Sequence, residues 1–301
     1  LVRHYRSYIE HEHRAGSRVK TLHRLTATFA DFADKRLTDL DALSIERWRR
    51  ERLRGGIAVS TIERDLAALR SVLAHAVRHG FIEISPMATI KPRKFDNARC
   101  RFLSDAEERS LRDALDLRDQ GMRDARESAN RWRVARNKDT MPAIEADTYP
   151  DHVTPLVLTA LNTGLRRGEL SSLLWTDIDL DRRSLTVRAA AAKGGKRRDV
   201  PLNSEAVAVL ARWRDQSDGP RVFGVADAKK AFSGVLQEAG IDGFTFHDLR
   251  HTFASKLVMG GTDLNTVREL LGHADLKMTL RYAHLAKGHK AEAVERLVAS
   301  S

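Results

Sequence analysis

Residues 244–285 read FTFHDLRHTFASKLVMGGTDLNTVRELLGHADLKMTLRYAHL, and this stretch decides how the rest of the chain is interpreted. It holds four histidines, three arginines and one of the chain's four tyrosines. These residue types bind phosphate oxygens or exchange protons. Apolar residues recur at helical spacing between glycine-rich breaks, which predicts helices joined by turns. The composition is that of an active site carried on helices.

Length and composition predict two domains that fold without metal or disulfide. The chain has 301 residues, and 42% of them are hydrophobic, which is enough for a core in each domain. Cys100 is the single cysteine, which suits a reducing compartment. No stretch approaches the ~18 apolar residues of a membrane span, and the N-terminus lacks a signal-peptide core. We expect a cytoplasmic protein with no membrane partner; the start at Leu1 rather than Met leaves an upstream domain open.

A strong positive charge makes a polyanion the expected partner. The formal net charge is +11 and the isoelectric point is near 10.0, values typical of nucleic-acid-binding proteins. Residues 1–100 carry 20 Lys and Arg against 12 Asp and Glu, so +8 of the charge lies in the first third. A solvated basic face is the alternative, but a DNA-binding surface is the favoured interpretation.

The first domain is predicted to be all helical. Residues 1–84 have apolar positions at three- and four-residue spacing and few β-branched runs. A helix is expected to start at Ser44, and the pattern at residues 60–63 resembles a capping box that opens a helix over residues 62–78. Four helices with a basic exterior would form a small DNA-binding domain.

A basic, proline-containing segment is predicted to join the two domains. Residues 85–102 have no usable period and are interpreted as an extended linker. A second capping-box pattern at residues 104–107 opens the next domain, residues 103–301. Residues 117–152 are highly charged and weakly periodic, so they are interpreted as a surface insertion with a helix around 125–134.

The second domain is predicted to be mainly helical with one small antiparallel sheet. Residues 153–161 form an apolar helix, and residues 184–190 and 198–202 are the two expected strands, joined by a tight turn at 193–196. Asn203 is placed to cap a further helix. The fold class is therefore mainly α with a small antiparallel β-sheet.

Two arginines and one lysine could bind a phosphate. Arg166 follows a Thr-Gly turn at the expected start of a helix, where backbone N–H groups also favour an anion. Arg250 lies in the His-x-x-Arg pattern, and an arginine fork donates two parallel hydrogen bonds to phosphate. Lys193 lies at the hairpin tip, although the neighbouring Lys196, Arg197 and Arg198 could bind backbone phosphates equally well. Each residue alone is more typical of an ordinary surface or salt-bridge position.

The histidines and the last tyrosine allow both catalytic and structural interpretations. His247 and His251 are four residues apart, a spacing found in zinc sites. Arg250 between them and the lack of a nearby third ligand argue against a metal. Tyr282, in a predicted helix, could equally be a partly buried core residue. No metal or cofactor is therefore expected.

Together these residues resemble the fingerprint of the tyrosine recombinase (phage integrase) family. The final block has intervals of 3, 23 and 9 residues, which match the usual spacing of that family, and the resemblance extends over nearly the whole chain. The interval between Ser104 and Arg166 is longer than usual. In order, the fingerprint residues are Arg166 with Glu169, Lys193, His247, Arg250, His273 and Tyr282.

The resemblance implies cutting and rejoining of DNA without metal or ATP. Tyr282 is expected to attack the scissile phosphate and give a 3′-phosphotyrosine with a free 5′-hydroxyl. Arg166 and Arg250 would hold the non-bridging oxygens, and His273 would donate a further hydrogen bond. Strands would then be exchanged through a Holliday junction.

The remaining fingerprint residues receive supporting roles from the same resemblance. Lys193 is expected to protonate the leaving 5′-oxygen, His247 to act on the nucleophile as general base, and Glu169 to orient the cluster. The fold would be the two-domain recombinase fold, with a core-binding domain and a catalytic domain. Residues 285–301 are expected to form a tail helix that docks on a neighbouring protomer.

The expected partners are double-stranded DNA at specific sites, three further protomers in a tetramer, and an accessory DNA-bending protein. The protein is expected to be nucleoid-associated and to serve a mobile element. Two alternatives remain open: a type IB topoisomerase-like nicking and closing enzyme, and a non-catalytic DNA-binding regulator. The target sequence and the direction, integration or excision, are not encoded in any readable pattern.

Overall fold

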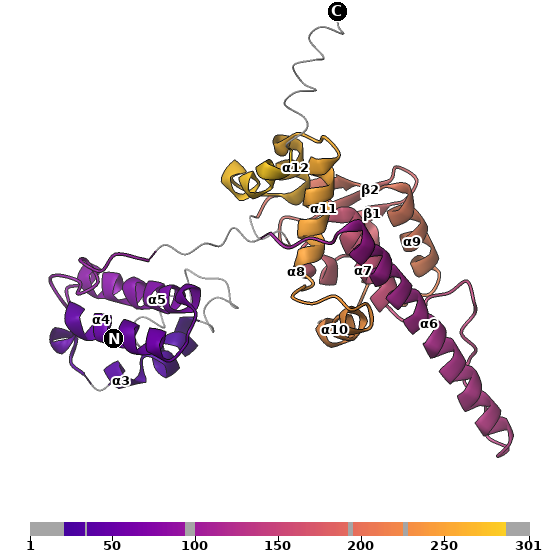
Figure 1. Ribbon diagram of the computed structural model, residues 1–301, viewed down its shortest axis with the longest axis horizontal. Helices are drawn as coiled ribbons and strands as arrows, with labels where there is room; N and C mark the ends of the chain where they lie inside the picture. The colour runs from indigo at the N-terminus through magenta and orange to yellow at the C-terminus, as the bar shows by residue number, and fades with distance from the viewer. Residues whose placement is uncertain (1–20, 34, 94–99, 192–194, 225–227, 287–301) are drawn as a thin grey trace, which may run out of the picture. The chain divides into compact units, whose positions relative to one another are not determined.

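The chain forms two compact units, Leu1–Asn97 and Ala98–Ser301. The computed structural model describes residues 21–33, 35–93, 100–191, 195–224 and 228–286 (Figure 1). Lys193 and the predicted tail helix over residues 285–301, apart from its first two residues, lie outside these ranges.

The first unit is a helical domain around a compact apolar core. Leu25 and Phe29 pack with Ile45, Trp48 and residues of the longest helix of this unit. The elements in chain order are η1 (Arg24–Thr28), α3 (Ala30–Ala33), η2 (Leu37–Asp39), α4 (Ala42–Arg54) and α5 (Val59–Arg78).

Two predicted helix starts in this unit are wrong by a few residues. Helix α4 begins at Ala42 because Asp41 caps it, and the Asp41 carboxylate accepts a hydrogen bond from the backbone N–H of Ser44. Helix α5 begins at Val59, so Ser60 is already inside it and no side chain caps its start. The expected capping-box partner, Glu63, is only 8% exposed and pairs with Arg49 at 3.1 Å instead.

Part of the predicted linker belongs to the core of the first unit. Met87 and Ile90 are buried in it. Burying these two apolar side chains is more favourable than leaving them exposed on an extended linker. Arg49 donates to the carbonyl of Lys91 at 3.0 Å, and Arg70 donates to that of Ile90 at 2.9 Å. These bonds fix the path of the chain as far as residue 91.

The second unit is a mainly helical domain with one small sheet (Figure 1). The sheet has the order β1-β2-β3 and is antiparallel throughout, with Leu185 opposite Ile178 on one side and Val200 on the other. The elements are α6 (Asp105–Val134), α7 (Val153–Thr163), α8 (Arg167–Ser171), η3 (Trp175–Asp177), β1 (Ile178–Asp179), β2 (Ser184–Val187), β3 (Arg198–Pro201), α9 (Ser204–Arg214), α10 (Lys229–Glu238), α11 (Asp248–Met259), α12 (Leu264–Leu271), η4 (Leu276–Met278) and η5 (Leu280–Leu285). The prediction of a mainly helical chain with a small antiparallel sheet is confirmed.

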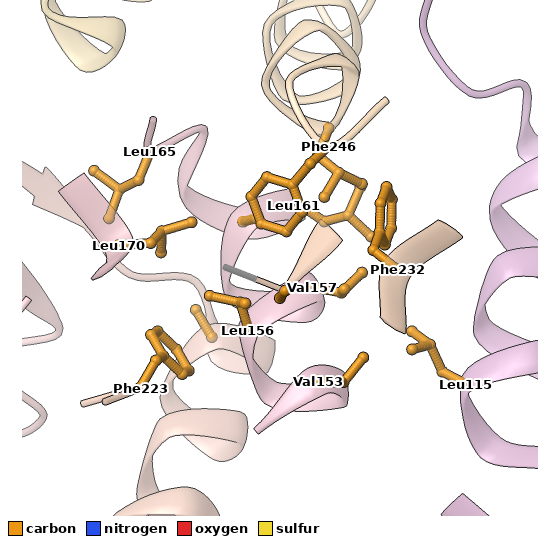
Figure 2. Packing of buried hydrophobic residues seen from close by; sticks show 14 of the residues in the cluster. Leu115, Val153, Leu156, Val157, Leu161, Leu165, Leu170, Phe223, Phe232 and Phe246 are labelled. Carbon is orange, nitrogen blue, oxygen red and sulfur yellow. The ribbon is translucent and has the colours of Figure 1, made fainter. Parts of the chain in front are cut away.

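Helix α7 lies at the centre of the core of this unit. Figure 2 shows its residues Val157 and Leu161 among Leu115 of α6, Phe232 of α10 and Phe246, which precedes α11. Helix α7 is buried on nearly all sides, as expected for a helix surrounded by others. The loop that leaves α7 therefore starts from a rigid position.

The charged region that follows residue 117 is more regular than predicted. Helix α6 continues unbroken through it to Val134, starting from the predicted Ser104–Glu107 capping box. Its buried residues end at Asp119, so the last four turns have only a weak apolar period, and the helix expected around 125–134 is the end of this longer helix. None of the helices in the described ranges is long and apolar enough to cross a membrane.

Candidate active site

Gly164 makes the turn that directs Arg166 into the site. It ends α7 with φ of 62° and ψ of 17°, a left-handed conformation that favours glycine. A Cβ atom at this position would lie 2.4 Å from Cδ1 of Phe253 on α11. The turn therefore needs glycine for both its conformation and its close contact, and Arg166 follows as the residue that caps α8.

Glu169 holds two arginines together. Its carboxylate, which is only 2% exposed, accepts hydrogen bonds from Arg166 Nη1 at 2.9 Å and from Arg198 Nη1 and Nη2 at 3.1 and 2.8 Å. It also accepts from the backbone N–H of Arg166 at 2.9 Å. Burial alone would raise the pKa of Glu169, but the bonds from Arg198 and Arg166 outweigh it and lower the pKa. Glu169 is therefore an ionised clamp between helix α8 and strand β3.

Arg250 is almost fully buried, and backbone carbonyls hold it. Nη1 donates to the carbonyl of Gly164 at 2.8 Å, and Nη2 donates to that of Leu271 at 2.6 Å, while the residue is 3% exposed. Burial and the nearby positive charge of Arg166 lower the pKa of Arg250 to about 9, so it remains charged at neutral pH. Arg166 Nη2 reaches the next carbonyl, that of Gly272, at 3.4 Å. The two guanidinium groups thus converge on the C-terminal end of α12.

His273 follows that helix end and is also buried. Gly272 ends α12 with φ of 63°, and the Nδ1 atom of His273 lies 2.9 Å from Oγ1 of Thr279. Burial, together with Arg250 and Arg166, lowers the pKa of His273 to about 3. The imidazole is therefore neutral at neutral pH, with Nδ1 held by the threonine.

Tyr282 is buried and pairs with a histidine. It is 1% exposed and lies in η5, with Ala254, Val258 and Val267 in the same apolar cluster. Its hydroxyl lies 2.6 Å from Nδ1 of His251. Burial raises the pKa of Tyr282 well above its ordinary value, so the hydroxyl keeps its proton at neutral pH.

His251 and His247 lie side by side on the first turn of α11. Their rings are 5.0 Å apart in an edge-to-face arrangement. Burial and His247 lower the pKa of His251 to about 4, while desolvation by the surrounding protein and the charge of Arg250 lower the pKa of the more exposed His247. The histidine in contact with the Tyr282 hydroxyl is His251, whereas the general base expected from the sequence is His247.

The structure thus brings four predicted residues together and leaves others apart. Arg166, Glu169, Arg250 and His273 surround the end of α12. Tyr282 lies with His251 in the adjoining apolar cluster. Lys193 lies outside the described residues, and no metal-binding cluster occurs among the residues that are described.

Two residues of the site were not identified from the sequence. The sequence indicates Arg198 only as one cation of the hairpin, and His251 only as half of a metal-ligand spacing. Arg198 could have been found because strand β3 alternates buried and exposed residues, which leaves its side chain on a defined face. His251 has no comparable signal, since its contact with Tyr282 spans 31 residues and two helices.

Comparison with known proteins identifies the family of this chain. The sequence profile of the phage integrase family matches residues 139–289. The tyrosine recombinase XerC of Xanthomonas campestris is 30% identical over 268 residues, covering 85% of this chain and 73% of the relative. The integrase of Salmonella phage P22 is 34% identical over 164 residues, covering 48% of this chain and 42% of the relative.

Solved structures show the same fold. The Tn1549 transposon integrase in complex with transposon right end DNA has a TM-score of 0.71 at 19% identity, with 99% of each chain covered. A lambda integrase dimer bound to a COC' core site has a TM-score of 0.68 at 18% identity, with 92% of this chain and 95% of that chain covered. Because the family profile spans half of the chain and XerC is related along most of it, this chain belongs to the phage integrase family of tyrosine recombinases.

Proposed function

We propose that this chain is a site-specific recombinase that cuts and rejoins DNA strands through a covalent bond to Tyr282. The observation that carries the proposal is a buried excess of positive charge. Three guanidinium groups, those of Arg166, Arg198 and Arg250, surround the single carboxylate of Glu169. A phosphodiester would supply the missing negative charge.

Arg166 and Arg250 are proposed to bind the two non-bridging oxygens of the scissile phosphate. Their anchoring to consecutive carbonyls at the end of α12 fixes both forks before substrate arrives, and such preorganisation lowers the barrier because little rearrangement is needed during the reaction. Arg198 keeps its two bonds to Glu169 and is proposed to position Arg166 rather than to touch substrate.

His273 is proposed to donate a hydrogen bond to the phosphate through Nε2. Its Nδ1 atom faces Thr279, and a ring nitrogen that accepts from the threonine hydroxyl leaves the proton on Nε2. A neutral donor suits this position, since Arg166 and Arg250 already supply two positive charges. The low pKa of His273 fits this role.

Tyr282 is proposed as the nucleophile and His251 as the group that first accepts its proton. The 2.6 Å contact between hydroxyl and Nδ1 is within proton-transfer reach. In the attack, the Tyr282 oxygen bonds to phosphorus, the bond to the 5′-oxygen breaks, and that oxygen takes up a proton. Lys193 remains the proposed donor of this proton, and His247 is proposed to support His251 through its neighbouring ring.

Rejoining is proposed to follow when a free 5′-hydroxyl of another duplex attacks the phosphotyrosine. No external energy source is required, because the phosphotyrosine bond conserves the energy of the phosphodiester bond that was cut. We further infer a tetramer on two DNA sites, help from an accessory DNA-bending protein, and a place at the nucleoid. The basic helical unit of residues 1–84 is proposed to bind the core DNA site.

The deciding experiment uses nicked duplexes whose central sequence is randomised. After incubation and denaturation, wild-type protein should retain a DNA strand covalently, and sequencing of the retained strands would identify the site. Tyr282→Phe should abolish the adduct while leaving most DNA affinity, because backbone contacts dominate binding. An adduct that persists in Tyr282→Phe contradicts the assignment, and retention of DNA without any adduct would instead indicate a binding protein.

A nicking and closing enzyme is the alternative that shares this chemistry. It would relax supercoiled plasmid that contains the selected site without producing Holliday junctions. Two labelled duplexes with that site distinguish the two, since a recombinase yields four-way junctions that migrate slowly on native gels. The family relationship favours the recombinase.

A further inference from the structure

The far end of helix α6 forms a protrusion with a basic and aromatic surface. Figure 1 shows α6 extending away from the rest of its unit. The last buried residue of the helix is Asp119, and Trp132 is 13 residues later, a rise of about 20 Å at 1.5 Å per residue. We call Arg131, Trp132, Arg133, Arg136 and Lys138 together the α6 tip.

The protrusion is held in shape by the chain that returns along it. The Asn130 side chain donates to the carbonyl of Met141 and accepts from its backbone N–H, both at 2.8 Å. Arg126 donates to the carbonyl of Pro142 at 2.7 Å, and Arg123 donates to that of Thr148 at 2.7 Å. These contacts lie beyond the domain core, so they stabilise the protrusion itself and add nothing to the packing of the core.

Charge is separated along helix α6, between its packed part and its protruding end. Residues 111–121 contain Arg112 and Arg118 against three aspartates, a net charge of −1, whereas residues 130–139 contain four basic residues and one aspartate, a net charge of +3. Favourable interaction of cations with the helix dipole explains basic residues in the last turn. It does not explain Arg136 and Lys138, which lie after the last helical residue.

An exposed tryptophan lies within these charges. Trp132 is 48% exposed. The Arg136 guanidinium lies 4.3 Å and the Lys138 ammonium 5.0 Å from the centre of its ring. Arginine and lysine with an aromatic face are the combination that binds nucleic acid through phosphates and through stacking or sugar contacts.

We propose that the α6 tip binds the phosphate backbone of duplex DNA that flanks the cleaved site. This inference rests on the proposed function, because it takes DNA as the substrate. The tip adds a contact about 20 Å outside the body of the catalytic unit. Duplex DNA carries one backbone charge per about 1.7 Å of its axis, so this distance corresponds to about 12 phosphates. The family profile begins at Asp139, so the tip lies outside the region that the profile matches.

The test compares two duplexes and two variants. The selected core site is prepared alone and with 30 base pairs added on each side, and affinity is measured by fluorescence anisotropy at several salt concentrations. The charge variant is Arg133→Gln, Arg136→Gln and Lys138→Gln combined. The matched control is Glu127→Gln, which removes a negative charge from the same exposed surface and should not weaken binding.

The long duplex should lose affinity with the charge variant, about 10-fold or more near physiological salt, and the slope of log K against log salt should fall by up to about 3, at roughly 0.9 per phosphate contact. The short duplex should bind both variants like wild type, and a thermal melt should be unchanged because the three residues lie beyond the core. Equal affinities on the long duplex, or equal losses on both, overturn the proposal.

Covalent adduct formation separates this proposal from the proposed function. On the short nicked duplex the charge variant should form the Tyr282 adduct at the wild-type rate. If wild-type protein forms no adduct but binds the long duplex through the tip, the proposed function fails and the inference stands. If adducts form and flanking DNA adds no affinity, the inference fails alone.

Discussion

Gly164→Ala should damage the site through one identifiable contact. The new Cβ would lie 2.4 Å from Phe253 Cδ1, in a backbone conformation with φ of 62°. A left-handed alanine costs roughly 1 to 2 kcal/mol and overpacking about 1 to 3 kcal/mol, while reduced entropy of the unfolded chain returns about 0.5 kcal/mol. We expect a loss of about 3 kcal/mol in urea denaturation. The rate of DNA cleavage should also fall, because the Gly164 carbonyl accepts a hydrogen bond from Arg250 and a shifted turn would displace it.

Two controls separate the backbone cost from the steric one. Gly240 has φ of 65° and an open space around it, so Gly240→Ala should lose only about 1 kcal/mol. In a Phe253→Leu background, Gly164→Ala should cost about 2 kcal/mol less than in wild type, the size of a direct coupling between neighbours. If Gly164→Ala and Gly240→Ala cost the same, or if Phe253→Leu gives no relief, the contact does not control the turn and the reasoning fails.

Three further predictions concern the charged groups. Glu169→Gln should cost about 3 kcal/mol in urea denaturation, because it leaves Arg198 without its buried partner; an unchanged midpoint would contradict the clamp. His251→Phe and Tyr282→Phe should each cost about 1 kcal/mol, and a double-mutant cycle should show coupling of similar size, whereas additive effects would mean that the 2.6 Å contact contributes nothing. Stability should fall as pH drops from about 6.5 towards 4, since the folded pKa values of His251 and His273, about 4 and about 3, lie below the unfolded value near 6.5 and only the unfolded state takes up protons there. Denaturation of wild type and His251→Phe at several pH values checks this, and the variant should show the smaller slope.

Local signals predicted much of the fold. The capping box at Ser104 and the cap at Asn203 appear where expected, because each depends on residues only three positions apart. The capping box predicted at residues 60–63 is wrong because Glu63 has a stronger, non-local partner in Arg49. A local pattern gives a wrong prediction where a buried charge on another helix pairs with the side chain that the pattern assigns to the cap.

The arrangement of the site was less predictable for the same reason. Spacing along the chain predicts that Arg250 and His273 belong to one site. It does not indicate that Arg166 and Arg250 both donate to carbonyls at the end of α12. Nor could it distinguish His247 from His251 as the partner of Tyr282, since the two histidines lie one helical turn apart at the start of α11. That choice depends on how η5 packs against α11.

The packing of η5 also determines how far the proposed nucleophile is buried. The segment buries Tyr282, a polar residue, at 1% exposure, while Leu276, Met278 and Leu280 beside it are 41 to 49% exposed. If Tyr282 is the nucleophile, as proposed, its oxygen must leave the contact with His251 to reach a phosphate. The proposed nucleophile therefore lies in the apolar cluster formed by η5, α11 and α12, while the Arg166, Glu169 and Arg250 cluster is held by its own hydrogen bonds at the end of α12.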